Sequence, residues 1–258
     1  MFNKVSALFF AVIAVVLLGV QSCKKDKPSP VIEDRIGDCT GNDKKDSVYN
    51  EVPNLDFENW YIGQGNKYLN PLPCNFWATP NESSVFSIGT IKSPVTVFRV
   101  GKDSAYSGNY AAMLKTGVSD LGVLGKKITA GSIASGQFKV ELNDLLNSLR
   151  FGRPFSRKPQ TVSGYYKYFP VEGDSASAYC FVTKSLGGGK IDTIGLGKKI
   201  FYDQQSTYAK FEFDLDYYSE DTPDRIVIYF SSSEAGDEFL GREGNTLFID
   251  EVKVTYRD

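Results

Sequence analysis

Apolar and polar residues alternate with period two along much of the chain after residue 50. Successive side chains of a strand point to opposite faces, so this alternation is typical of half-buried β-strands. The pattern predicts strands at 52–61, 94–100, 110–116, 161–170, 179–184, 208–215, 225–230 and 245–256. Leu142, Leu145, Leu146 and Leu149 recur at helical spacing before Gly152 and predict one short helix. The chain is therefore predicted to be all-β, a two-sheet β-sandwich of jelly-roll type with one short helix.

The last predicted strand contains a carboxylate in an apolar setting. Strict alternation in residues 245–256 places Phe248, Asp250, Val252, Val254 and Tyr256 on one face. A carboxylate on an inward face is unfavourable unless another group pairs with it. We therefore expect Asp250 to have a partner, which is a set of backbone amides, a cation or an arginine.

Two other stretches are predicted to lack regular secondary structure. Residues 70–81 are too rich in proline for regular structure but contain Phe76 and Trp77, which predicts a well-packed loop. Residues 185–199 are dense in glycine, but their spacing does not meet the pattern of a phosphate-binding loop. We interpret the second stretch as a flexible hairpin loop.

The N-terminus has the pattern of an export signal. A positive start at Lys4 precedes an almost unbroken apolar run over 5–20, which is shorter than a membrane-spanning helix requires. The run ends at Cys23 and resembles a bacterial lipoprotein signal. We predict a signal peptide at 1–22, lipidation of Cys23, and a polar flexible tether at 23–48 that precedes the domain at 49–258. An ordinary secretory signal or a membrane anchor is the alternative.

Composition removes several classes of function. The chain has 258 residues and a formal net charge of −2, so it has no basic surplus for nucleic-acid binding. It contains 0 His, which excludes Ser-His and Cys-His nucleophiles and every zinc site that needs histidine. An enzyme with this composition would depend on carboxylates, Lys or Tyr.

Three cysteines follow Cys23, namely Cys39 in the predicted tether and Cys74 and Cys180 in the domain. An odd number in an exported chain leaves at least one thiol free. The spacings match no metal motif, so we expect Cys74 and Cys180 to be small buried hydrophobic residues. The pairing of the three stays open.

Five segments in series resemble a known family. They are 76–81 (FWATPN), 106–114 (YSGNYAAML), 151–155 (FGRPF), 164–168 (GYYKY) and 247–252 (LFIDEV). In this order they resemble the putative carbohydrate metabolism domain of lipoproteins from Bacteroidetes-type bacteria, over about residues 52–256. A more distant resemblance is to jelly-roll carbohydrate-binding modules. These similarities imply the fold and a saccharide as the ligand class.

The distant resemblance also implies a structural calcium ion. Such modules hold it between an opening Glu, a Ser-Gly turn and a closing Asp, which correspond here to Glu58, residues 107–108 and Asp250. Hard oxygen ligands suit calcium. The alternative is that Asp250 accepts hydrogen bonds from backbone amides while Glu58 is solvated. In either case we expect Asp250 to fasten the last strand to the first.

Saccharide sites combine aromatic platforms with polar side chains, because sugars present apolar C–H faces beside hydroxyl groups. The candidate ligand-binding residues are Trp60, Trp77, Asn81, Arg99, Tyr166 and Tyr168. For each aromatic side chain, packing in the core is the alternative.

The sequence thus predicts a non-catalytic glycan-binding or glycan-handling lipoprotein of the cell envelope, held in the outer membrane by its lipid anchor. Its expected partner is a polysaccharide or oligosaccharide. One alternative is a glycoside hydrolase that uses two carboxylates, although no spacing nominates a pair. The other is a structural or adhesive envelope protein that binds a protein partner.

Overall fold

The computed structural model describes residues 36–37, 39, 48–63, 66–85, 92–138 and 149–257. The chain divides into two units, Met1–Asp34 and Arg35–Asp258, and all described residues belong to the second. The predicted signal peptide, Cys23, most of the predicted tether and residues 142–148 of the predicted helix lie outside the described residues. Within the described ranges, no helix is long and apolar enough to span a membrane.

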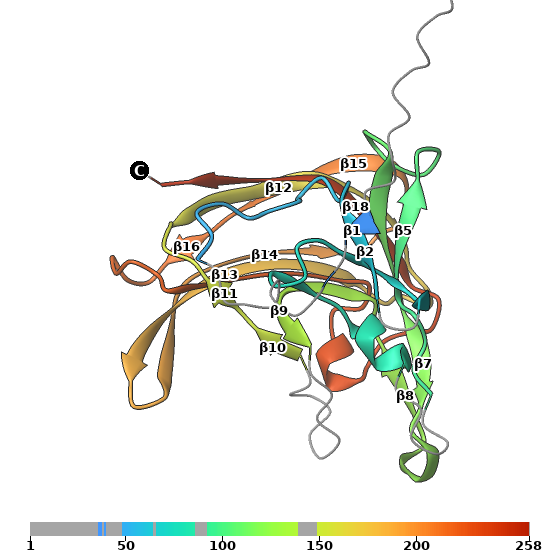
Figure 1. The fold of residues 1–258 in the computed structure, drawn as a ribbon. Coiled ribbons are helices and arrows are strands. Elements are labelled where there is room, and N and C mark those ends of the chain that lie inside the picture. The colour runs from blue at the N-terminus through green and yellow to red at the C-terminus, as the bar shows by residue number, and fades with distance from the viewer. Residues whose placement is uncertain are drawn as a thin grey trace, which may run out of the picture. The chain divides into compact units, whose positions relative to one another are not determined.

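Two antiparallel sheets form a β-sandwich of jelly-roll type, seen as an upper and a lower layer in Figure 1. The upper sheet has the order β15-β12-β18-β6-β5. Its strands are β5 (Val97–Gly101), β6 (Tyr110–Lys115), β12 (Pro159–Phe169), β15 (Gln205–Asp214) and β18 (Thr246–Tyr256). These five strands confirm five of the predicted segments, because each has one buried and one partly solvated face.

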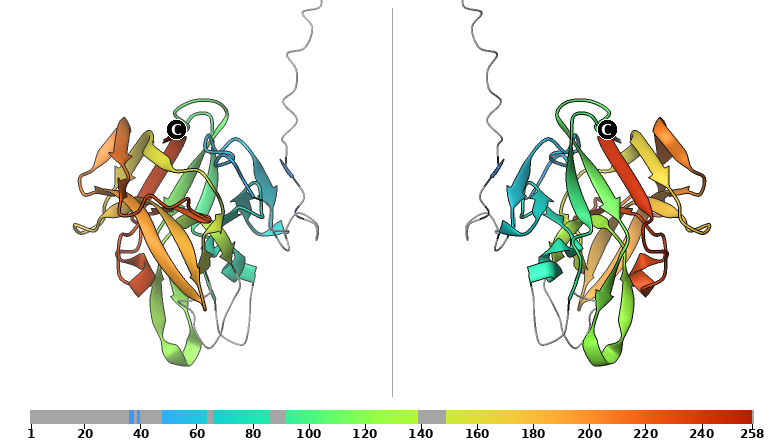
Figure 2. Two further views of the ribbon diagram at one scale, coloured as in Figure 1. Left: turned by 90° about the vertical axis from the view of Figure 1, so that its left-hand side faces the viewer. Right: turned by 90° about the vertical axis from the view of Figure 1, so that its right-hand side faces the viewer.

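The lower sheet has eight strands with the main path β10-β9-β17-β13-β14-β16, while β4 pairs with β9 and β11 with β17. Its strands are β4 (Trp77–Ala78), β9 (Ser132–Phe138), β10 (Leu149–Phe151), β11 (Arg153–Pro154), β13 (Ala176–Gly187), β14 (Lys190–Phe201), β16 (Asp216–Tyr217) and β17 (Arg225–Ser231). Smaller elements are the sheet of β1 (Ile36–Gly37), β2 (Trp60–Ile62) and β3 (Leu69–Pro71), the hairpin of β7 (Gly117–Asp120) and β8 (Lys126–Thr129), and the 3-10 helices η2 (Pro80–Val85), η3 (Gly122–Leu124) and η5 (Gly236–Glu238). Figure 2 shows the β7–β8 hairpin extending away from the sandwich.

The core lies between the two sheets and is built from alternate positions of their strands. In the lower sheet, Ala178, Cys180 and Ile228 are completely buried, and in the upper sheet Val162 and Leu247 are. This side-chain alternation is the physical basis of the period-two pattern in the sequence. Cys180 is a free, buried thiol, as expected.

A β-bulge in β18 overturns the predicted facing of the last strand. Ser163 pairs with Lys253 but Tyr165 pairs with Asp250, so β18 carries one extra residue there, and Glu251 has a φ of 47°. Before the bulge the odd-numbered residues point inward, and after it the even-numbered residues do. Phe248 and Asp250 therefore lie on the outer face of the upper sheet, opposite the face that Val252 occupies.

The bulge also links β18 to the N-terminal part of the domain. The backbone N–H of Val252 donates to the Leu55 carbonyl at 2.9 Å, and not to the neighbouring strand β12. The segment before β2 is not the predicted strand 52–61, because Asn54 and Phe57 have positive φ values of 52° and 50° and the chain turns there. Only its last residues join a strand.

Part of the predicted tether belongs to the folded unit. Ile36 and Gly37 pair in parallel with Trp60 and Tyr61. Cys39 forms a disulfide with Cys74, which corrects the expectation that Cys74 is only a buried hydrophobic residue. Local spacing cannot reveal such a pairing, because the two cysteines meet through the fold.

Two further predictions were wrong in detail. The glycine-dense stretch 185–199 is mostly strand, because β13 and β14 pair from Ala176 and Phe201 up to Gly187 and Lys190. Glycines 187 to 189 have positive φ and form the tight turn, as glycine readily does. Leu149, the last residue of the predicted helix, begins strand β10 and pairs with Phe138.

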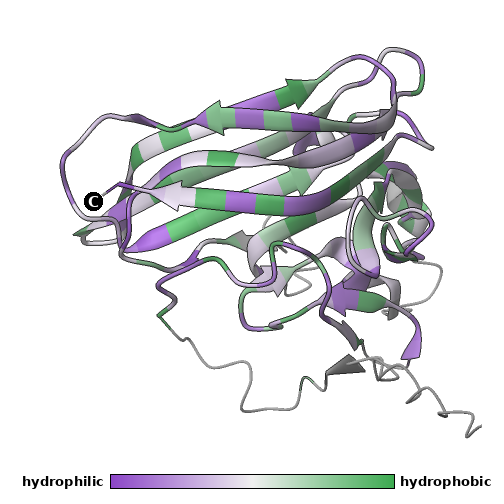
Figure 3. Cartoon of the chain, turned by 90° about the horizontal axis from the view of Figure 1, so that it is seen from above, coloured by the Kyte–Doolittle hydropathy of each residue, from purple (hydrophilic) through white to green (hydrophobic). Residues whose placement is uncertain are grey.

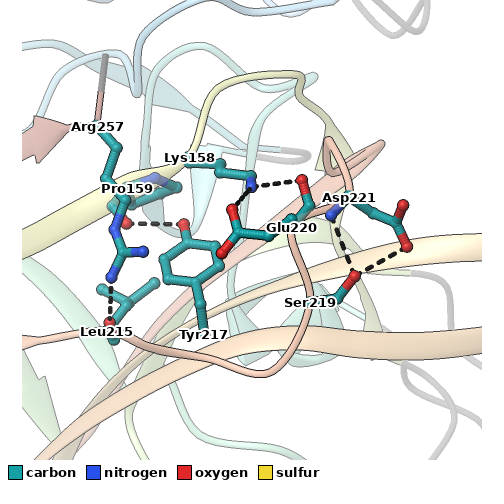
Figure 4. Close-up of polar contacts among 8 residues, drawn as sticks. All are labelled: Lys158, Pro159, Leu215, Tyr217, Ser219, Glu220, Asp221 and Arg257. Carbon is teal, nitrogen blue, oxygen red and sulfur yellow. Dashed lines mark hydrogen bonds and ion pairs between the residues drawn. The ribbon is translucent and has the colours of Figure 1, made fainter.

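Polar contacts tie the two sheets together near the C-terminus (Figure 4). The Tyr217 hydroxyl, from the lower sheet, donates to the Pro159 carbonyl of the upper sheet at 2.7 Å. The Lys158 ammonium donates to the Glu220 carbonyl at 2.6 Å, and the Arg257 guanidinium lies 4.1 Å from the centre of the Tyr217 ring. These contacts fix how β12 and β16 approach each other.

Candidate functional site

Three of the predicted aromatic platforms are core residues. The side chains of Trp60, Trp77 and Tyr168 are 0%, 1% and 0% exposed. Their polar atoms have partners inside the protein: the Trp77 indole donates to the Pro53 carbonyl at 3.0 Å and the Tyr168 hydroxyl to the Asp174 carbonyl at 3.1 Å. A side chain without accessible surface cannot stack on a saccharide. The alternative of core packing therefore holds for all three.

Asn81 is also buried, and its amide organises the edge of strand β5. The side-chain nitrogen donates to the Val97 carbonyl at 2.7 Å and to the Leu69 carbonyl at 3.2 Å. The side-chain oxygen accepts hydrogen bonds from the backbone N–H groups of Thr96 and Val97. Asn81 thus joins β3 to β5 and corrects the prediction that it contacts a ligand.

The two other predicted residues lie in different places. Tyr166 points into the sandwich, where its ring packs 4.3 Å from that of Phe201. Burial raises the pKa of Tyr166 above its usual value. Arg99 lies on β5, with its guanidinium 4.0 Å from the centre of the Tyr110 ring. Of the six candidates, Arg99 lines a pocket.

This pocket has a volume of about 440 Å³ and lies between the β2–β3 hairpin and β5. Its lining residues are Ile62, Asn66, Lys67, Tyr68, Leu69, Val95, Val97, Phe98 and Arg99. The volume falls in the range of about 300–1,000 Å³ that is typical of small-molecule sites. Its lining combines apolar and aromatic side chains with the cationic side chains of Lys67 and Arg99.

Glycine shapes one wall of the pocket. A Cβ atom at Gly63 would lie 1.9 Å from the Tyr68 ring, so this ring packs directly on the Gly63 backbone. The N–H of Gly63 donates to the Tyr68 carbonyl at 3.0 Å and closes the hairpin. No local pattern in the sequence shows that Tyr68 lines the same pocket as Phe98 and Arg99.

Glu58 and Asp250 hold the same turn, the one that connects β5 to β6. The Asp250 carboxylate is completely buried and accepts hydrogen bonds from the N–H groups of Tyr106 and Ser107 at 2.8 and 3.1 Å. Glu58 accepts from the N–H groups of Asn109 and Tyr110 at 2.7 and 3.0 Å. The two carboxylates form a clamp on the turn. Asp250 therefore holds the β5–β6 turn, which corrects the expectation that it fastens the last strand to the first.

The clamp does not fit a calcium ion between the two carboxylates. Calcium takes 6–8 oxygen ligands in a typical site, whereas the turn presents N–H donors to both Glu58 and Asp250. In the part of the chain that the structure describes, no group of three or more His, Cys, Asp or Glu side chains could hold a metal. Burial raises the pKa of Asp250 to about 6, although the three backbone N–H donors oppose that rise.

Comparison with known proteins points to carbohydrates. The family model described as "Putative carbohydrate metabolism domain" matches residues 54–180 and 192–255. A putative glycoside hydrolase from Bacteroides vulgatus ATCC 8482 has a similar fold, with a TM-score of 0.65 and 19% identity, over 83% of this chain and 100% of that chain. A second, from Bacteroides thetaiotaomicron VPI-5482, has a TM-score of 0.56 and 21% identity, over 77% of this chain and 67% of that chain.

At these identities the two structures show a shared fold and nothing about chemistry. A family 61 carbohydrate-binding module in complex with β-1,4-galactotriose also matches, with 14% identity over 81% of this chain and 99% of that chain. Its TM-score of 0.38 is too low to support a conclusion. No curated protein matches the chain at a significant level.

Proposed function

Because the chain belongs to the putative carbohydrate metabolism domain family, we propose that it binds a saccharide in the pocket between the β2–β3 hairpin and β5. The family match covers most of the folded unit and supports glycan binding or handling. The finer proposal is that the protein acts without catalysis, as a glycan-binding lipoprotein of the cell envelope.

The composition of the pocket wall carries this proposal. Phe98, which is partly exposed, offers aromatic surface for the C–H face of a sugar, whereas Tyr68 is a buried part of the wall. Lys67 and Arg99 are donors for the oxygen atoms of the sugar. Oriented saccharide binding needs both kinds of group around one site. The pocket brings them together from segments 66–69 and 95–99, which are distant in the sequence.

The same wall favours binding over hydrolysis. Most glycoside hydrolases place two carboxyl groups about 5–9.5 Å apart on either side of the scissile bond. None of the described residues that line the pocket is Asp or Glu. The carboxylates of Glu58 and Asp250 face the turn that they clamp. The proposed role is therefore capture and presentation of a glycan.

The proposed location rests on the N-terminal pattern and on the disulfide. Structural disulfides form and persist in oxidising compartments, and Cys39–Cys74 is such a bond. We expect Cys23 to be acylated and the domain to be held at the outer membrane. Incorporation of labelled palmitate into the full chain, and its loss in Cys23→Ala, would test this; labelling that persists in the variant contradicts it.

Calorimetry or affinity gels with a panel of polysaccharides would test the binding itself. Removal of aromatic surface in Phe98→Ala should weaken binding by about tenfold, which corresponds to about 1.4 kcal/mol. Lys67→Ala should weaken it less. Tyr202→Ala is the matched control, because Tyr202 is 66% exposed and does not line the pocket. An equal effect of Phe98→Ala and the control, or a lack of binding to any saccharide, would contradict the proposal.

A further inference from the structure

A row of partly exposed side chains begins at the pocket and crosses the outer face of the upper sheet. Phe98 of β5 pairs with Met113 of β6, Met113 pairs with Phe248 of β18, and Phe248 pairs with Lys167 of β12. Residues directly opposite each other on neighbouring strands share a face. We call these four residues the outer row.

The next row along the same strands shows which face is solvated. Val97, Leu114, Leu247 and Tyr168 are paired in the same way and are each at most 1% exposed. They form the inner side of the sheet, against the core. The members of the outer row point the other way and are partly exposed. Figure 3 looks onto this sheet from above and shows apolar and polar positions alternating along its strands.

Aromatic rings extend the outer row to the fifth strand. The Lys167 ammonium lies 4.4 Å from the centre of the Phe248 ring and 4.5 Å from that of the Tyr208 ring on β15. Tyr106, which is 45% exposed, lies 5.5 Å from Tyr208 and stacks on Tyr165 at 3.7 Å. Lys167 and Tyr208 both donate to the Ser104 carbonyl, at 3.1 and 2.9 Å, so the turn between β5 and β6 borders the row. The row is thus a partly exposed strip of aromatic and apolar side chains.

The length of the row indicates the shape of its ligand. From Phe98 to Lys167 it crosses three strand spacings, which is about 14 Å. A single sugar ring is about as long as one such spacing, so one ring beside Phe98 leaves the rest of the row uncovered. A linear chain of sugars can place successive rings over successive strands.

We infer that the ligand is a linear oligosaccharide of about three or more sugars, which runs from the pocket across the outer row toward β15. This inference rests on the proposed saccharide binding and adds the class of glycan. The protein would bind internal sugars of a linear polysaccharide chain and not a single terminal sugar. Apolar rings contact the C–H faces of the chain. The Lys167 ammonium beside Phe248 donates one hydrogen bond to the Ser104 carbonyl at 3.1 Å and has two further N–H groups for oxygen atoms of the ligand.

Affinity as a function of chain length tests the inference. Calorimetry on the detergent-solubilised full chain would use oligomers of one to six sugars from a polysaccharide that binds. We expect affinity to rise by about tenfold or more between two sugars and four, and then to level off. Phe248→Ala should remove this gain and leave the affinity for the shortest ligand within about twofold.

Controls separate loss of the row from loss of folding. Phe151→Ala removes an aromatic ring that is 43% exposed on the other sheet, and it should leave the gain unchanged. Met113→Gln replaces an apolar side chain of the row by a polar one of similar volume, and it is the second row variant if Phe248→Ala does not fold. It should also reduce the gain in affinity with chain length. Equal affinity at every length, or a gain that survives both row variants, overturns the inference while saccharide binding stands. Failure of every saccharide to bind overturns the proposed function, and the inference with it.

Discussion

The buried carboxylate of Asp250 makes the stability of the domain depend on pH in a specific way. Asp250 is completely buried, and burial raises its pKa from 3.8 to about 6. The folded protein therefore holds this proton more tightly than the unfolded chain does. The stability that Asp250 contributes is fully present below pH 3.8 and is lost as the pH rises through about 6.

The size of the effect follows from the shift. A change of one pKa unit corresponds to 1.36 kcal/mol, so a rise from 3.8 to about 6 corresponds to about 3 kcal/mol over this pH range. Asp250→Asn isolates this contribution, because an amide has nearly the same shape but does not titrate. Other carboxylates titrate alike in both proteins, so the difference between the two free energies of unfolding reports Asp250 alone.

Urea denaturation at pH values from 4 to 7 would measure this difference. Asp250→Asn is expected to be less stable than the natural protein at pH 4, because the protonated carboxyl still offers two oxygen atoms to the three N–H donors and Asn offers one. The deficit should shrink by about 2–3 kcal/mol toward pH 7. A deficit that stays constant across the range would refute the reasoning, since it would mean that Asp250 titrates alike in the folded and unfolded states.

Three other predictions concern the framework of the domain. Gly131→Ala should destabilise it by about 3 kcal/mol in thermal melting, because the new Cβ would lie 2.4 Å from the Lys115 backbone nitrogen; a shift below about 1 kcal/mol would contradict this. Cys74→Ala should lower the free energy of unfolding by up to about 4 kcal/mol, since the bond closes a loop with a separation of 35 residues, and a reductant should then have no further effect. Calcium or EDTA should leave the melting temperature unchanged, because N–H groups occupy the clamp; a rise with calcium that Asp250→Asn abolishes would restore the calcium site.

The sequence by itself determined the class of the fold and most of the upper sheet. Period-two alternation predicted the strands that the structure has at Tyr110–Lys115, Pro159–Phe169, Gln205–Asp214 and Thr246–Tyr256. The motifs also pointed to the carbohydrate-related family that the comparison shows. Both kinds of information are local, because a strand with one buried face has apolar residues at every second position of its own segment.

Only the tertiary structure decided which face of each strand is buried and which aromatic residues stay accessible to solvent. Trp60 and Trp77 lie in the core, whereas Phe98 and Phe248 lie on the outer face of the upper sheet. The amino-acid composition does not distinguish these four aromatic residues. One extra residue at Glu251 reverses the alternation of the last strand, and a bulge leaves no clear mark on the hydrophobic pattern.

The sequence pattern did not predict the pocket or the clamp, for a related reason. Their groups come from segments that are far apart in the chain, such as Tyr68 with Phe98 and Glu58 with the turn before Tyr110. Hydrogen bonds and packing between such segments depend on strand order and register, which alternation does not encode. The sequence thus determined that this chain forms a β-sandwich, and the pairing of distant segments decided which side chains meet in the pocket and in the clamp.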